Sequence, residues 1–131
     1  MGRALALCGA LCLATLLACS EDQVFCAPLP AWAVAVDVRD SVTNVPVVSG
    51  ARGAVFLAGA LDDSLRPERL LHLFPDTVLV GGMSVGRVEV RIEHVGYRPW
   101  TATDVQTRLS QGECPDWETH ELTARLQAEA E

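Results

Sequence analysis

The chain of 131 residues contains several short segments in which apolar and polar positions alternate, which is the period of a half-buried strand. The clearest is 87–93, where three β-branched residues alternate with arginine and glutamate. A second segment runs from Trp32 to Arg39. Weaker patterns bounded by glycine, proline or other turn-forming residues predict further strands at 45–49, 54–58, 77–80, 105–109 and 119–126.

Between these segments, the stretch 61–75 contains Asp62, Asp63 and Pro67, which are disfavoured inside strands. We expect it to be a long connection with one helical turn. The chain therefore predicts an all-β fold, an antiparallel β-sandwich of about seven strands. Trp32 and Trp100 are expected to lie in its core, because large aromatic side chains are mostly buried.

The first eighteen residues have the pattern of a secretory signal peptide. Arg3 is the only charge before Glu21. The apolar run 4–17 would be about 21 Å long as a helix, which is short of the ~30 Å hydrocarbon core of a bilayer. It ends in Leu-Leu-Ala-Cys at 16–19, which resembles the bacterial lipobox. The resemblance implies cleavage before Cys19 and attachment of palmitate-type acyl chains to it.

Several acyl chains on one residue anchor a protein stably in a membrane. We therefore expect a signal peptide at 1–18 and a lipidated N-terminus and tether at 19–27. Ser20 resembles the signal for sorting to the outer membrane. The expected location is the bacterial cell envelope, at the outer membrane facing the periplasm or the exterior. The alternative is an ordinary secretory peptide in which Cys19 is incidental.

Two of the five cysteines, Cys26 and Cys114, remain after the signal peptide and the lipidation site are set aside. An even pair in an exported chain predicts a disulfide. The alternatives are two free thiols or a metal-binding pair. A metal pair would need a nearby CxxC or histidine cluster, which the sequence lacks. We expect no metal and no other cofactor.

The formal net charge is −7, and all ten basic residues are arginine. These arginines form no basic run. Binding to nucleic acid depends on clustered cations that displace counterions from phosphates. We therefore expect no nucleic-acid partner.

Several features in one order resemble the carboxypeptidase regulatory-like domain. They are the strand 32–39, the turn Asp40-x-x-Thr43-Asn44-x-Pro46, Val95-Gly96-Tyr97, Trp100, and Cys114 leading into Thr119-x-x-Leu122-x-Ala124-x-Leu126. The resemblance covers about 28–127 and implies a transthyretin-like (prealbumin-like) sandwich. The residues after it, 128–131, are expected to form a polar tail. The resemblance also implies that the first and last strands are parallel neighbours, so that the disulfide would join their starts.

The motif Gly-Met-Ser-Val-Gly at 82–86 matches the GxSxG pattern of serine hydrolases, and Asp104 and His120 follow in the order of their triad. That nucleophile needs a helix after it, whereas the clearest strand of the chain follows here. We therefore interpret the glycines around Ser84 as a hairpin loop. No HxxE or HExxH pattern occurs in the sequence, so a zinc peptidase is not supported.

The sequence thus favours a non-catalytic, lipid-anchored envelope domain with a structural or protein-interaction role. Its partners would be the membrane, through the lipid, and an envelope protein or a glycan. The alternative is a small carbohydrate-binding module, which would require Trp117 exposed beside Tyr97. A serine hydrolase centred on Ser84 is the remote alternative.

Overall fold

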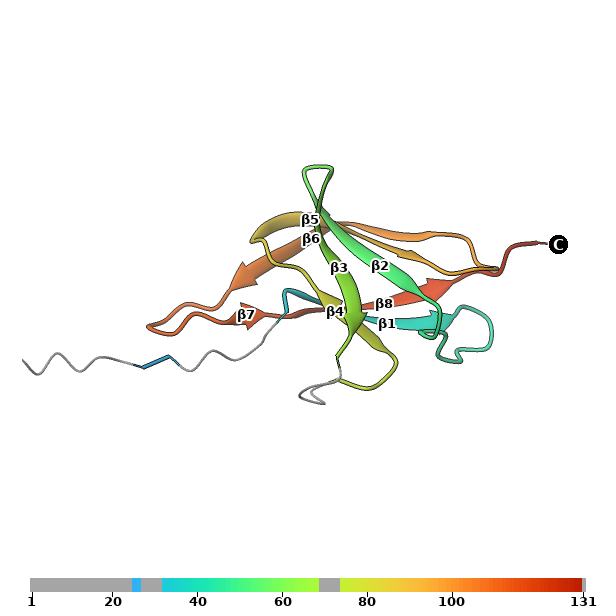
Figure 1. Cartoon of the computed structure of the whole chain (residues 1–131), viewed down its shortest axis with the longest axis horizontal. Helices are drawn as coiled ribbons and strands as arrows, with labels where there is room; N and C mark the ends of the chain where they lie inside the picture. The colour runs from blue at the N-terminus through green and yellow to red at the C-terminus, as the bar shows by residue number, and fades with distance from the viewer. Residues whose placement is uncertain (1–24, 27–31, 69–73, 131) are drawn as a thin grey trace, which may run out of the picture.

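The computed structural model describes residues 25–26, 32–68 and 74–130. This part of the chain is all-β, as predicted, and consists of eight strands (Figure 1). The strands are β1 (Val34–Asp40), β2 (Arg52–Leu57), β3 (Ala60–Pro67), β4 (Val78–Gly81), β5 (Gly86–Glu93), β6 (Trp100–Leu109), β7 (Trp117–Glu118) and β8 (His120–Leu126). Across these ranges there is no helix of the length and apolarity needed to traverse a bilayer.

All eight strands belong to one sheet in the order β7-β6-β5-β2-β3-β4-β1-β8. The sheet curls until it nearly closes, since the chain after β8 returns to the turn before β6. There the N–H of Arg98 donates to the carbonyl of Gln127 over 2.8 Å, and Tyr97 forms a β-bridge with Ala128. At the other end, β7 pairs with β6 and leads directly into β8. Ala128, the first residue of the predicted polar tail, is therefore part of the closure.

The strand β3 joins two halves of the sheet that we expected to be separate layers. Its first part pairs with β2 from Ala60 to Leu65, and its last two residues, Arg66 and Pro67, pair with β4. The prediction of a connection with a helical turn over 61–75 is wrong for 61–67, which is strand, and positions 69–73 lie outside the described residues. Cross-strand pairing on both sides outweighs the low strand propensity of its aspartates and proline. The predicted strand at 45–49 is not formed, because only Pro46 makes an isolated bridge there, to Arg39. Without it, and with β3 and the two-residue β7 added, the count is eight and not about seven.

The hydrophobic core fills the inside of the curled sheet. Every strand except β7 contributes a buried apolar side chain to it. The alternation predicted for β5 is confirmed, because Val88, Val90 and Ile92 are all buried. Gly53 in β2 leaves room for the side chains of Leu65 and Ile92, since a Cβ there would lie 2.7 Å and 2.8 Å from their Cδ1 atoms. Each fully buried aliphatic side chain contributes roughly 1.5–3 kcal/mol relative to exposure.

The strands β1 and β8 are parallel neighbours, paired from Val34 with His120 to Asp40 with Leu126. This is the arrangement that the resemblance implied for the first and last strands. The inward residues of β8 are Leu122, which is half-buried, and Ala124 and Leu126, which are fully buried. Continued back from Leu122, the same alternation predicts that His120 faces inward, but it is exposed at the start of the strand.

The position of Trp32 differs from the prediction. Both Ala33 and Val34 belong to the inner cluster, so the alternation of β1 begins at Val34 and not at Trp32. Trp32 packs instead on the outer face of β1 and β4, edge-on to Phe74 with ring centroids 6.4 Å apart. Trp100 does pack against the core, but as the first residue of β6, which begins five residues earlier than predicted.

Leu126 offers a direct test of how the last strand supports the core. We expect Leu126→Ala to lower the free energy of unfolding by about 2–5 kcal/mol, because it leaves a cavity where β8 meets the core. The matched control is Leu61→Ala, whose side chain is 62% exposed and whose loss should change stability by less than about 0.5 kcal/mol. Urea denaturation followed by circular dichroism measures both. Equal effects of the two substitutions would contradict the placement of β8.

Candidate functional site

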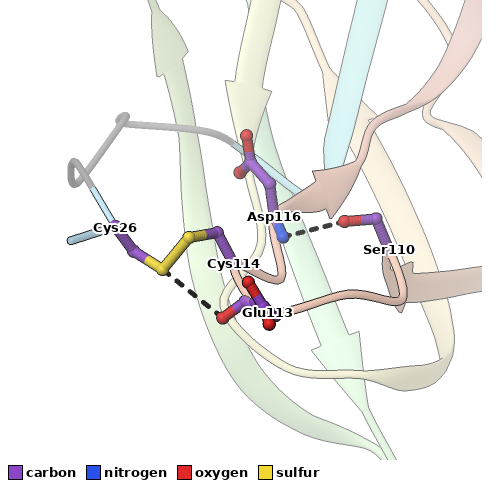
Figure 2. The surroundings of a disulfide bond; sticks show 5 residues. All are labelled: Cys26, Ser110, Glu113, Cys114 and Asp116. Atoms are coloured by element: carbon purple, nitrogen blue, oxygen red, sulfur yellow. Dashed lines mark hydrogen bonds between the residues drawn. A yellow bond between two sulfur atoms is a disulfide. The ribbon is translucent and has the colours of Figure 1, made fainter. Parts of the chain in front are cut away.

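The structure joins Cys26 and Cys114 through a disulfide with a Cα–Cα distance of 5.4 Å (Figure 2). Cys114 lies in the turn 110–116 between β6 and β7. Ser110 closes this turn, because its N–H donates to the carbonyl of Asp116 over 2.7 Å and its hydroxyl accepts the N–H of Asp116 over 3.0 Å. The Sγ atom of Cys26 lies 3.4 Å from the carbonyl oxygen of Glu113. This contact is not a hydrogen bond, because a disulfide sulfur carries no hydrogen.

Two hydrogen bonds join the residues just before β1 to those at the start of β8. The hydroxyl of Thr119 donates to the carbonyl of Trp32 over 2.8 Å, and the N–H of His120 donates to the carbonyl of Ala33 over the same distance. These bonds lie immediately before the parallel ladder of β1 and β8. The disulfide therefore fastens the starts of the first and last strands at one end of the molecule.

Removing the disulfide should weaken the whole domain, because it closes a loop with a sequence separation of 88. In the chain-entropy model such a loop is worth about 4–5 kcal/mol. We expect Cys26→Ser/Cys114→Ser to lower the free energy of unfolding by roughly 2–5 kcal/mol in urea denaturation. A reducing agent should destabilise the natural protein and leave the double variant unchanged. If it leaves both unchanged, the two thiols are not bonded.

Ser84 lies in the loop between β4 and β5, and its hydrogen bonds to Asp62 hold this loop in place. Its hydroxyl donates to the carboxylate of Asp62 in β3. The same carboxylate accepts the N–H groups of Met83 and Ser84 over 2.9 Å and 3.2 Å. Asp63 accepts the N–H of Gly82 over 3.0 Å. Two adjacent carboxylates thus hold the loop that carries the GxSxG motif.

A hydrolase site is not assembled around Ser84. The strand β5, not a helix, follows at Gly86, and Asp104 forms an ion pair with Arg87 over 3.5 Å. Burial acts to raise the pKa of Asp62, but the hydrogen bonds from Ser84 and Met83 outweigh it and hold that pKa below its usual value. An ionised carboxylate that accepts three donors stabilises a loop.

We expect Asp62→Asn to lower the free energy of unfolding by about 1–2 kcal/mol at neutral pH, because it removes the charge from three hydrogen bonds. The sign of the pH dependence follows from a lowered folded pKa. The stabilisation is complete above the ordinary value of 3.8 and disappears as pH falls through the folded value. The difference between the natural protein and the variant should therefore shrink below about pH 4.

Thermal unfolding from pH 7 to pH 3 measures this effect. Ser84→Ala is the matched control, because it removes one donor and leaves the two N–H bonds to Asp62. It should cost less than Asp62→Asn at pH 7. A pH-independent difference in stability between the natural protein and Asp62→Asn would contradict the role of the ionised Asp62 carboxylate in holding the loop.

Tyr97 connects two turns at the other end of the sheet. Its hydroxyl donates to Asp40 over 3.1 Å. The other oxygen of Asp40 accepts the N–H groups of Val42 and Thr43. These bonds, first among them the one from Thr43, lower the pKa of Asp40. Partial burial, together with Asp40, raises the pKa of Tyr97. The Asp-x-x-Thr turn and the Gly-Tyr turn of the sequence motif therefore form one hydrogen-bonded unit.

Tyr97 and Trp117 do not form a common surface. Tyr97 precedes β6 by three residues, whereas Trp117 pairs with Leu109 at the far end of this ten-residue strand. Their separation along β6 is about 30 Å. Both rings are half-buried against the core. The structure thus separates the two residues that a sugar-binding platform would need to present together.

His94 lies edge-on to Tyr97, with ring centroids 4.9 Å apart. Its ring nitrogens lie 2.7 Å and 2.9 Å from the carbonyl oxygens of Val95 and Ser49. The ring is therefore engaged by backbone, as expected for a structural histidine. Within 25–26, 32–68 and 74–130, no three His, Cys, Asp or Glu side chains gather as metal ligands would.

Cys19 and the segment 1–18 lie outside the residues that the structure describes, as do positions 20–24 of the tether. No protein-family model matches the chain, and no curated protein matches its sequence.

Proposed function

We propose that the protein is a non-catalytic, lipid-anchored module of the bacterial cell envelope with a structural or protein-interaction role. The observation that carries this proposal is the position of the disulfide relative to the lipobox-like cysteine. Cys26 follows Cys19 by seven positions and is bonded to Cys114. Seven residues span at most about 25 Å. A lipid on Cys19 would hold the folded domain close to the membrane surface.

Two further features support the proposal. A disulfide persists in the oxidising compartments outside the cytoplasm, which agrees with export. The hydroxyl of Ser84, the candidate nucleophile from the sequence, donates to Asp62, and within the described part of the chain no histidine is among its hydrogen-bond partners. The partner in this proposal is an envelope protein or a glycan, and no nucleic acid is involved.

For the fold family, we propose a carboxypeptidase regulatory-like domain with a transthyretin-like sandwich. Its two layers would be β4-β1-β8 and β6-β5-β2, with β3 passing from one to the other. The parallel pairing of β1 and β8 supports this assignment. The hydrogen bond between Tyr97 and Asp40 also supports it, because it joins two of the motifs on which the resemblance is based.

Substitution of the lipobox-like cysteine tests the anchor. In a bacterial host that processes lipoproteins, we expect Cys19→Ser to abolish labelling by palmitate and to move the protein from the membrane fraction to the soluble fraction. The reason is that the acyl chains supply the membrane affinity, at ~0.8 kcal/mol per buried CH₂.

Cys26→Ser/Cys114→Ser is the matched control, because it also replaces cysteine but leaves the lipobox-like motif intact. It should keep the label and remain in the membrane fraction. Natural protein that carries no label, or that is soluble with Cys19 unmodified, would refute the anchor.

A further inference from the structure

We propose that one end of the domain rests on the bilayer that holds the lipid of Cys19. This end is the apolar rim, formed by the side chains of Phe25, Met83, Val85 and Leu109. The inference rests on the proposed lipid anchor and extends it, because it states which surface of the protein meets the membrane and which surface faces away.

Three members of the rim lie at the same end of β5 and β6. Gly86 pairs with Thr107, and the hydroxyl of Thr107 donates to the carbonyl of Ser84 over 2.7 Å. Met83 and Val85 come just before this pairing, and Leu109 comes just after it. The register of the two strands therefore places these residues at the same end of the sheet.

The disulfide brings Phe25 to this end. Cys114 lies in the turn that follows Leu109, and its bond to Cys26 fixes the residue next to Phe25 there (Figure 2). In Figure 1 this turn projects from the end of the molecule opposite the C-terminus. The tether from Cys19 thus enters the fold at the rim.

The rim side chains are unusually open to solvent for their type. Phe25 is 93% exposed, Met83 71%, Val85 53% and Leu109 40%. Exposed apolar surface is stabilised when another surface removes it from water. The tether between Cys19 and Cys26 spans at most about 25 Å. It therefore keeps the rim close to the bilayer that holds the lipid.

Two other exposed apolar side chains lie at the end to which the tether does not lead. Val42 and Val95 are 89% and 92% exposed, in the turns joined by Asp40 and Tyr97. These turns lie near the C-terminal end of the molecule in Figure 1. They are separated from the rim by the length of β6, about 30 Å. Seated on the rim, the domain would present this opposite end to an envelope partner.

The contact would be apolar and not electrostatic. Removal of the signal peptide removes Arg3, so the net charge of −7 becomes −8. An acidic domain is repelled by anionic lipid over about a Debye length. The rim should therefore contact zwitterionic bilayers more closely than anionic bilayers at low salt, and added salt should reduce the difference.

Methionine provides a specific probe, because Met83 is the only methionine after the signal segment. The processed lipoprotein is labelled with methyl-¹³C methionine and placed in nanodiscs of zwitterionic lipid. Some of the lipid carries a nitroxide on its acyl chain. We expect the Met83 methyl signal to lose most of its intensity relative to discs without the nitroxide.

The matched control is the variant Met83→Leu/Val95→Met, which carries its single methionine at the opposite end. Its methyl signal should keep its intensity. An unchanged Met83 signal, or equal losses at the two positions, would overturn the membrane-facing rim. Mass spectrometry of the same sample separates the two proposals. Acyl groups on Cys19 with an unchanged Met83 signal would refute only the rim, whereas an unmodified Cys19 would refute the anchor as well.

Discussion

The parallel ladder between β1 and β8 is the contact on which the rest of the fold depends. Through β1 it connects the last strand to the sheet, and it places Leu126 in the core beside residues from the start of the domain. Joining segments so distant along the chain carries a loop-closure cost in entropy. The disulfide and the hydrogen bond from Thr119 to Trp32 act at the start of that ladder, where a cross-link stabilises it most directly.

The strands with a clear alternation could be predicted from the sequence, because a half-buried strand needs only its own side chains to show its faces. Thus β5 and β8 were located within a residue or two. The strand β3 was missed because Asp62, Asp63 and Pro67 argue against a strand locally. Their role depends on partners in β2, β4 and the β4–β5 loop, which no local pattern contains. Here the pairing of Arg66 and Pro67 with β4 joins the two expected layers into one sheet.

The candidate site also has parts that could be predicted from the sequence and parts that could not. The Cys26–Cys114 bond could be expected from the cysteine count, and the loop conformation at Ser84 from its glycines. The Asp62 carboxylate that holds Ser84 is 22 positions away, so it could not be foreseen. The separation of Tyr97 from Trp117 depends on where β6 begins. Starting that strand at Trp100 lengthens it and places the two rings at its opposite ends.

The ladder between β1 and β8 also constrains how the polypeptide reaches its native state during synthesis. The strand β1 emerges from the ribosome first, but one of its edges has no partner until the final segment has been made. An unpaired valine-rich edge readily joins other chains into aggregates. The nascent polypeptide therefore carries this open edge until its last residues appear, and a chain that lacked β8 would keep the edge open.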